Sequence, residues 1–143
     1  MKKLSILFVS VLTLGLAVTS CSSDDDKEGT LEGKWELTEV GAVLAGQEIL
    51  QPATNEGCAN DVVEFKADGK FVDSYSEFTD DKCKAYTQEG TWAKDGSSLS
   101  KTYGTNNTEK YEVAELTGNK LKLKETYTES GITVSAVLVF KKI

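Results

Sequence analysis

The sequence predicts an all-β fold, an eight-stranded antiparallel up-and-down barrel, from three observations. From Thr30 onward, short segments of alternating polar and apolar residues follow one another. Turn residues such as Asp-Gly and Asn-Asn separate these segments at hairpin spacing. Closure into a barrel removes exposed strand edges, which an open meander would leave free. A two-sheet β-sandwich is the alternative that strand counting leaves open.

The eight predicted strands differ in how clearly they show the alternation. In Lys120–Thr128, Leu121 and Leu123 face one side while Lys120, Lys122 and Lys124 face the other, which predicts one buried face. Ile132–Lys142 carries apolar residues on both sides, so this strand is expected to be covered on both. The other six strands are predicted at Leu31–Val40, Val62–Lys66, Lys70–Ser76, Gln88–Lys94, Ser98–Tyr103 and Glu109–Leu116.

One stretch of this region, Gly41–Asn60, lacks a strand pattern. It contains the only proline of the chain, Pro52. It is predicted to be a long loop or to hold one helical turn near Val43–Glu48.

The first twenty residues match a secretory signal peptide. Lys2 and Lys3 form a basic start, Leu4–Val18 is mainly apolar, and Thr19 and Ser20 are small. The apolar run is shorter than the roughly 20 residues that a spanning helix needs. Cleavage after Ser20 is therefore expected.

The residues at the expected cleavage point are Val18-Thr19-Ser20-Cys21: an aliphatic residue, two small residues and a cysteine. They resemble the lipobox of bacterial lipoproteins, in which the chain is cut before the cysteine and its thiol is diacylated. The resemblance implies a removed signal (1–20), a lipidated Cys21 opening a tether (21–29), and a folded domain (30–143). Two or more acyl chains hold a protein firmly on a membrane. The alternative is a plain cleaved signal with Cys21 as an ordinary cysteine.

The segment after Cys21, SSDDDKEG, is polar and charged, which predicts a disordered tether. Its aspartates lack the spacing of an EF-hand calcium loop. A serine followed by an acidic run after a lipidated cysteine resembles the export signal of some Gram-negative lipoproteins. That resemblance implies the outer membrane, with the external and periplasmic faces both open.

Charge and cysteine content restrict the partners and cofactors. Losing Lys2 and Lys3 from 16 basic residues leaves 14 against 23 acidic ones, a net charge of −9. This acidity argues against nucleic acid and against electrostatic docking on anionic lipid. Lipidation of Cys21 leaves Cys58 and Cys83, which are expected to form a disulfide in an oxidising compartment, with two free thiols as the alternative. Two cysteines without any histidine do not make a zinc site, and no metal or cofactor is predicted.

Several short motifs occur in a recognisable order. Gly33-Lys34-Trp35 opens the first predicted strand, and Asp61–Phe65, Asp68–Phe71 and Gly90–Trp92 follow. With the two cysteines, they resemble the lipocalin-like domain of small secreted bacterial lipoproteins, over roughly residues 31–140. The resemblance implies a small barrel whose floor is closed by Trp35, a ligand cavity and, in many members, a disulfide. The C-terminal helix and the later signature of classical lipocalins are missing.

Seven side chains are candidates for a cavity lining or for the core. An eight-stranded barrel is only just wide enough for side chains to fill it, so the aromatic candidates are expected to pack the interior. Glu125 continues the inward row of Leu121 and Leu123; it is either a polar group in a cavity or, the favoured interpretation, a solvated residue near the barrel mouth. The candidates are Trp35, Phe65, Phe71, Trp92, Tyr111, Glu125 and Tyr127.

No catalytic arrangement is present in the sequence. Without histidine, Ser-His-Asp and Cys-His arrangements are excluded, and there is no phosphate-binding loop. The protein is therefore predicted not to be an enzyme. The leading hypothesis is a membrane-anchored binding module for a small molecule, glycan or protein. The alternatives are an accessory envelope lipoprotein that acts through its outer surface, or an enzyme inhibitor that displays Asn55–Asn60 or Thr79–Lys84 as a protruding loop.

Overall fold

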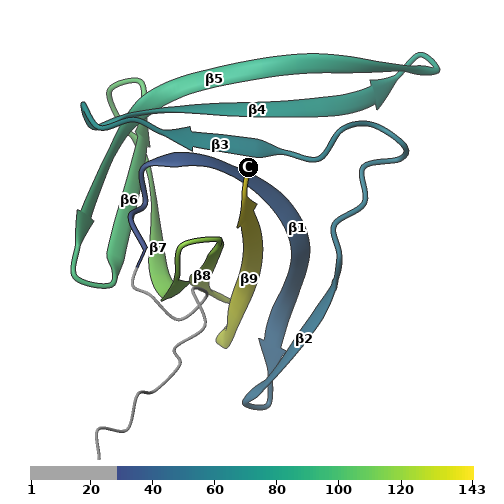
Figure 1. Ribbon diagram of the computed structural model, residues 1–143. Coiled ribbons are helices and arrows are strands. Elements are labelled where there is room, and N and C mark those ends of the chain that lie inside the picture. Colours follow the sequence, from purple (N-terminus) through teal and green to yellow (C-terminus); the bar gives the residue numbers. More distant parts are fainter. Residues whose placement is uncertain (1–28) are drawn as a thin grey trace, which may run out of the picture.

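The computed structural model describes residues 29–143, which form nine β-strands and no helix (Figure 1). The predicted signal peptide, Cys21 and the tether before Gly29 lie outside the described residues. Within residues 29–143 there is accordingly no helix of the length and apolarity needed to cross a membrane. The strands are β1 (Gly33–Leu44), β2 (Gln47–Pro52), β3 (Val62–Phe65), β4 (Lys70–Thr79), β5 (Lys82–Asp95), β6 (Ser98–Tyr103), β7 (Asn107–Leu116), β8 (Lys120–Glu129) and β9 (Ile132–Lys142).

Eight of these strands close into an antiparallel barrel. Each strand from β3 to β9 pairs with its neighbour in the chain, and β1 pairs with β9 on one edge and β3 on the other. β2 is an additional strand that pairs with the second half of β1. The predicted all-β up-and-down barrel is therefore confirmed, and the sandwich alternative is excluded.

The prediction of a loop or helical turn within Gly41–Asn60 is wrong. β1 continues to Leu44 and turns directly into β2. The turn residues Ala45 and Gly46 have φ of 51° and 78°, the left-handed geometry of a two-residue hairpin. Because alanine rarely occupies that position, the Ala-Gly pair was not recognised as a turn. Only the segment between β2 and β3 is a loop.

The hairpin of β4 and β5 is longer than predicted. β4 extends to Thr79 and β5 begins at Lys82, where a loop was expected at Thr79–Lys84. Asp80 and Asp81, with φ of 55° and 57°, form the tight turn. β3 pairs only with residues 71–74 of β4, and β6 pairs with β5 only from Gly90 onward. The distal half of the hairpin therefore projects beyond the barrel (Figure 1).

The alternating strand directions give the barrel two different ends. One end, called the floor, carries the chain entry at Gly29, the C-terminus and the turns β3–β4, β5–β6 and β7–β8. The other end, called the mouth, carries the turns β1–β2, β4–β5, β6–β7 and β8–β9. The projecting hairpins β1–β2 and β4–β5 lie at the mouth (Figure 1).

The core fills the floor half of the barrel. Trp35 is fully buried, and its indole N–H donates to the carbonyl of Leu31 at 2.7 Å. The Lys142 ammonium lies 5.0 Å from the ring centre and covers it from the other side. The other buried residues of this cluster come from five further strands: Val63, Phe65, Phe71, Leu99, Leu121, Leu123 and Phe140.

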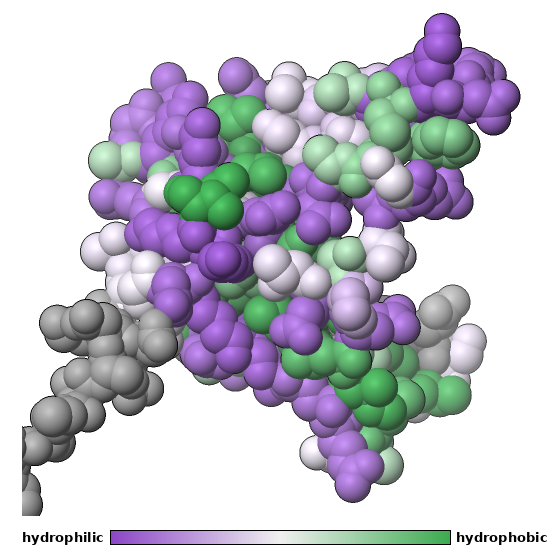
Figure 2. All heavy atoms as spheres, turned by 45° about the vertical axis from the view of Figure 1, so that its right-hand side comes forward, coloured by the Kyte–Doolittle hydropathy of each residue, from purple (hydrophilic) through white to green (hydrophobic). Residues whose placement is uncertain are grey.

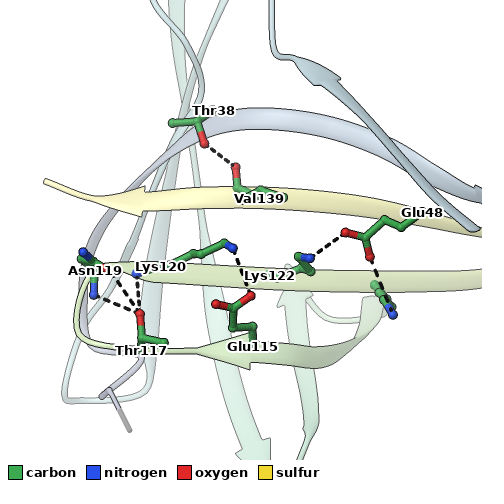
Figure 3. A network of polar contacts seen from close by, with 9 residues as sticks. Thr38, Glu48, Glu115, Thr117, Asn119, Lys120, Lys122 and Val139 are labelled. Atoms are coloured by element: carbon green, nitrogen blue, oxygen red, sulfur yellow. Dashed lines mark hydrogen bonds and ion pairs between the residues drawn. The ribbon is translucent and has the colours of Figure 1, made fainter. Parts of the chain in front are cut away.

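A second, smaller apolar layer lies outside the barrel. Val137 and Val139 of β9 point outward and are buried, as expected for a strand covered on both faces. On this outer face the carboxylate of Glu48 in β2 accepts a hydrogen bond from Lys122 of β8 at 2.6 Å (Figure 3). β2 lies close to β1 at Gly41, where a Cβ would stand 1.9 Å from the carbonyl oxygen of Ile49.

Candidate functional site

A half-open cavity of about 310 Å³, called the inner cavity, lies within the barrel between the core and the mouth. Strands β1, β3, β8 and β9 supply apolar walls, and β4, β5, β6 and β7 add polar and aromatic groups. The lining includes Leu37, Asp61, Phe65, Asp73, Tyr75, Lys101, Tyr103 and Tyr111.

One wall of the inner cavity is a hydrogen-bonded network between three strands. The ammonium of Lys101 donates to both carboxylate oxygens of Asp73, at 3.0 and 2.7 Å. The hydroxyl of Tyr103 lies 2.7 Å from Asp73 and 3.1 Å from Glu109, and that of Tyr111 donates to Glu109 at 2.8 Å. Lys101 is 8% exposed, so this is a nearly buried ion pair. Within residues 29–143 no buried side-chain polar atom lacks a partner.

The network fixes the protonation of its tyrosines. Burial and the hydrogen bond to Asp73 raise the pKa of Tyr103 well above its usual value. Burial and the hydrogen bond to Glu109 raise the pKa of Tyr111 in the same direction. Both phenols therefore remain neutral hydrogen-bond donors at physiological pH, and neither is set up to act as a base.

A side pocket of about 310 Å³ adjoins the inner cavity. The two share Leu37, Asp61 and Tyr75, so these residues form the boundary between them. The outer part of the side pocket is more polar and is lined by Asn55, Glu77 and neighbouring residues of the β2–β3 loop and β4. The pocket exists because β3 is only four residues long and leaves the second half of β4 without a neighbour on that edge. Figure 2 shows the surface hollowed between the projecting hairpins.

A disulfide and a side-chain bond hold the loop that borders the side pocket. Cys58 in the β2–β3 loop is bonded to Cys83 at the start of β5, which confirms the predicted pairing. The amide of Asn55 donates to the carbonyl of Ser76 in β4 at 2.8 Å. The loop is thus fixed to the projecting hairpin at two points.

The predicted candidates divide between core and cavity. Phe65 and Tyr111 line the inner cavity. Trp35 and Phe71 are fully buried in the core below it. Trp92 packs half-buried against that core, edge-on to Phe65 with ring centres 5.6 Å apart. Three of the six aromatic candidates therefore fill space in or against the core, and two line the inner cavity.

The last two candidates lie toward the mouth. Glu125 follows the inward row of β8, as its pairing with Ala136 shows, but it is half-buried and lies outside the cavity lining. Tyr127 is 46% exposed, so its assignment to the core or cavity is wrong. The reason is that β7 pairs with β8 only as far as Lys124, and the rest of the β8–β9 hairpin extends past the barrel.

The sequence reasoning missed most of the polar wall. Asp73, Lys101, Tyr103 and Glu109 were not candidates. The sequence signal was in Ser98–Tyr103, where Lys101 lies between Leu99 and Tyr103 on the same, inward face of the strand. An inward lysine in a small barrel requires a buried acidic partner, and this rule could have indicated the pair.

Comparison with known proteins gives a family match and a fold match. A family model described as a lipocalin-like domain matches residues 31–123. No curated protein matches the chain. An uncharacterized protein from Bacteroides eggerthii superposes with a TM-score of 0.54 at 17% identity, over 80% of this chain and 100% of that one.

Two mammalian structures superpose less closely. A dog lipocalin allergen has a TM-score of 0.47 at 14% identity, over 78% of this chain and 73% of that chain. Bovine odorant binding protein in complex with undecanal has a TM-score of 0.47 at 17% identity, over 82% and 76%.

Proposed function

We propose that this chain, which belongs to the lipocalin-like domain family, is a membrane-anchored lipoprotein whose barrel binds a small molecule and catalyses no reaction. The inner cavity carries this proposal. Its volume of about 310 Å³ lies at the lower end of the range for small-molecule sites. Mainly apolar walls with a few converging polar groups are the usual composition of such sites.

The polar wall supports binding rather than catalysis. Asp73 and Glu109 both accept hydrogen bonds from neighbouring side chains, and the tyrosines that donate them stay protonated. A general base needs a free lone pair directed at the reacting proton. In this wall the polar groups instead fix one another, which suits a preorganised surface for a ligand.

The proposed location follows from the N-terminal residues. A lipidated Cys21 would attach the domain to a bilayer, and the acidic run after it favours the outer membrane of a Gram-negative bacterium. The Cys58–Cys83 disulfide supports an oxidising compartment outside the cytoplasm.

Native mass spectrometry of the protein purified from its own host tests the binding function. We expect a copurifying small molecule that is lost on unfolding. Gln88→Phe places a ring at the exposed rim of the inner cavity and should lower its occupancy at least fivefold. Gln47→Phe makes the same change on the exposed face of β2, away from both cavities, and should leave the occupancy unchanged. Equal occupancy in the two variants would contradict a ligand in the inner cavity.

Fractionation of cells grown with labelled palmitate tests the anchor. Cys21→Ser should abolish labelling and release the protein from the membrane fraction. The double variant Cys58→Ser/Cys83→Ser, which keeps Cys21, should remain labelled and membrane-bound. A Cys21→Ser protein that stays in the membrane fraction would refute lipid anchoring.

A second candidate function, action on a protein through the outer surface, is favoured by one observation. The end of the β4–β5 hairpin projects from the barrel, is tied down by the disulfide, and exposes Phe78 (45%) and Tyr86 (39%). Large exposed apolar side chains on a fixed projection suit a protein contact. A photo-crosslinker at Phe78 should then capture one defined envelope protein, whereas the same crosslinker at exposed Lys110 should not. Equal capture from both positions would rule out a specific contact at the hairpin.

A further inference from the structure

The two adjoining cavities carry an uncompensated negative charge. Their walls contain three carboxylates, Asp61, Asp73 and Glu77, and one ammonium, Lys101, which leaves a net charge of −2. The ammonium of Lys101 is already held by both oxygens of Asp73. The negative charge therefore resides on Asp61 and Glu77.

Asp61 lies at the boundary between the inner cavity and the side pocket, since it lines both. Among residues 29–143, no lysine or arginine forms an ion pair with it. Asp61 is exposed at the rim, and its carboxylate accepts a hydrogen bond from the backbone N–H of Ser76; partial burial and the charge of Asp73 together raise its pKa above the usual value. A cation placed beside this carboxylate would offset the repulsion from Asp73.

The surrounding side chains also suit an ammonium group. Tyr75 borders both cavities together with Asp61, and Tyr103 and Tyr111 line the inner one. Aromatic faces attract cations through their quadrupole. The protein already uses this attraction in the same wall, because the Lys101 ammonium lies 4.5 Å from the ring centre of Phe71 and 5.3 Å from that of Tyr103.

We propose that the ligand is a cationic amphiphile, an organic amine with an apolar body. Its ammonium group pairs with Asp61 at the boundary, and its body occupies the inner cavity against Leu37 and Phe65. A carboxylate ligand such as a fatty acid is repelled by the same wall. A metal ion does not fit either, because no three metal-ligating side chains come together within the described part of the chain. The inference depends on the proposed small-molecule function and specifies its ligand class.

Three probes with the same six-carbon body separate charge from apolar contact: hexylammonium, 1-hexanol and hexanoate. Each is titrated calorimetrically into the full chain carrying Cys21→Ser, purified without detergent. We expect hexylammonium to bind about tenfold more tightly than 1-hexanol, which corresponds to ~1.4 kcal/mol, and hexanoate to bind more weakly than 1-hexanol.

Two matched variants locate the charge. Asp61→Asn keeps the side-chain shape and should bring the affinity for hexylammonium to within about threefold of that for 1-hexanol. Asp95→Asn makes the same change at the floor end of β5, outside both cavities, and should preserve the tenfold preference.

The outcomes distinguish this inference from the function on which it rests. If 1-hexanol binds but hexanoate binds as tightly as hexylammonium, the cationic ligand class is wrong and small-molecule binding stands. The same holds if Asp61→Asn leaves the preference unchanged. If none of the three probes binds, the proposed function fails together with the inference.

Discussion

The ion pair between Lys101 and Asp73 should contribute measurably to the free energy of unfolding. Lys101→Met keeps the length and apolar stem of the side chain but removes the ammonium that binds both oxygens of Asp73. The Asp73 side chain is only 19% exposed, so its carboxylate would be left nearly buried with the Tyr103 hydroxyl as its remaining side-chain donor. Breaking a buried ion pair from one side typically costs 3–5 kcal/mol. Because some solvent reaches Asp73, we expect a loss of about 3 kcal/mol.

Urea unfolding followed by tryptophan fluorescence measures this loss. A cost of ~3 kcal/mol is large against the roughly 5–15 kcal/mol by which domains are stable. Lys84→Met is the matched control, because Lys84 forms an ion pair of similar length with Asp80 but is 45% exposed, and exposed pairs contribute about 0–1 kcal/mol.

A second substitution tests the cause of the loss. If the buried charge of Asp73 is responsible, then adding Asp73→Asn to Lys101→Met should recover part of the lost stability, because a neutral amide can still accept from Tyr103. The reasoning is refuted if Lys101→Met costs less than 1 kcal/mol, or if the double variant is less stable than the single one.

Three further predictions concern the layer outside the barrel and the disulfide. Gly41→Ala should lower the free energy of unfolding by about 1–3 kcal/mol, because its Cβ would meet the Ile49 carbonyl at 1.9 Å. Hydrogen exchange should then show faster exchange of the β1–β2 amides. The control Ala45→Gly, at a position with φ of 51°, should not lower the stability. The hydrogen bond from Lys122 lowers the pKa of Glu48 below its ordinary value of 4.5, so the stabilisation from this contact is present above pH 4.5 and is lost as the pH falls through the lowered pKa. Glu48→Gln should thus cost about 0.5–1 kcal/mol in urea unfolding at pH 7 and almost nothing at pH 2. Reduction of the disulfide, which closes a 25-residue separation, should lower the free energy of unfolding by roughly 3.5 kcal/mol, and an unchanged urea midpoint would contradict this.

The barrel could be predicted because its strands carry their own signals. Leu121 and Leu123 are buried, whereas the alternating lysines at 120, 122 and 124 are not, as period-two alternation requires. Strand β2 was not predicted because its sequence lacks this alternation. Its residues cover an outer surface rather than the core, so most of them are exposed and no alternation marks them. Its turn is formed by Ala45, a residue type with little preference for positive φ.

The candidate site was less predictable because it depends on register. Asp73, Lys101 and Glu109 lie on β4, β6 and β7, and they meet only because β5 pairs with β4 and β6, and β6 with β7, in one particular alignment. A shift by one residue would turn Lys101 outward and break the network. Side-chain type could indicate that an inward lysine needs a partner, but the choice among 23 acidic residues requires the folded arrangement.

The two ends of the barrel connect the proposed anchor with the proposed binding. The chain enters at the floor, where the Gly29 amide donates to the Leu116 carbonyl, and Gly29 is the eighth residue after Cys21. Fully extended, eight residues span at most about 28 Å. A lipid on Cys21 would therefore keep the floor within about 28 Å of the bilayer, a reach that allows the mouth to point away from it. With the mouth directed away, the side pocket and Asp61 would face the aqueous phase, and an amine ligand would reach the barrel from solution rather than from the membrane.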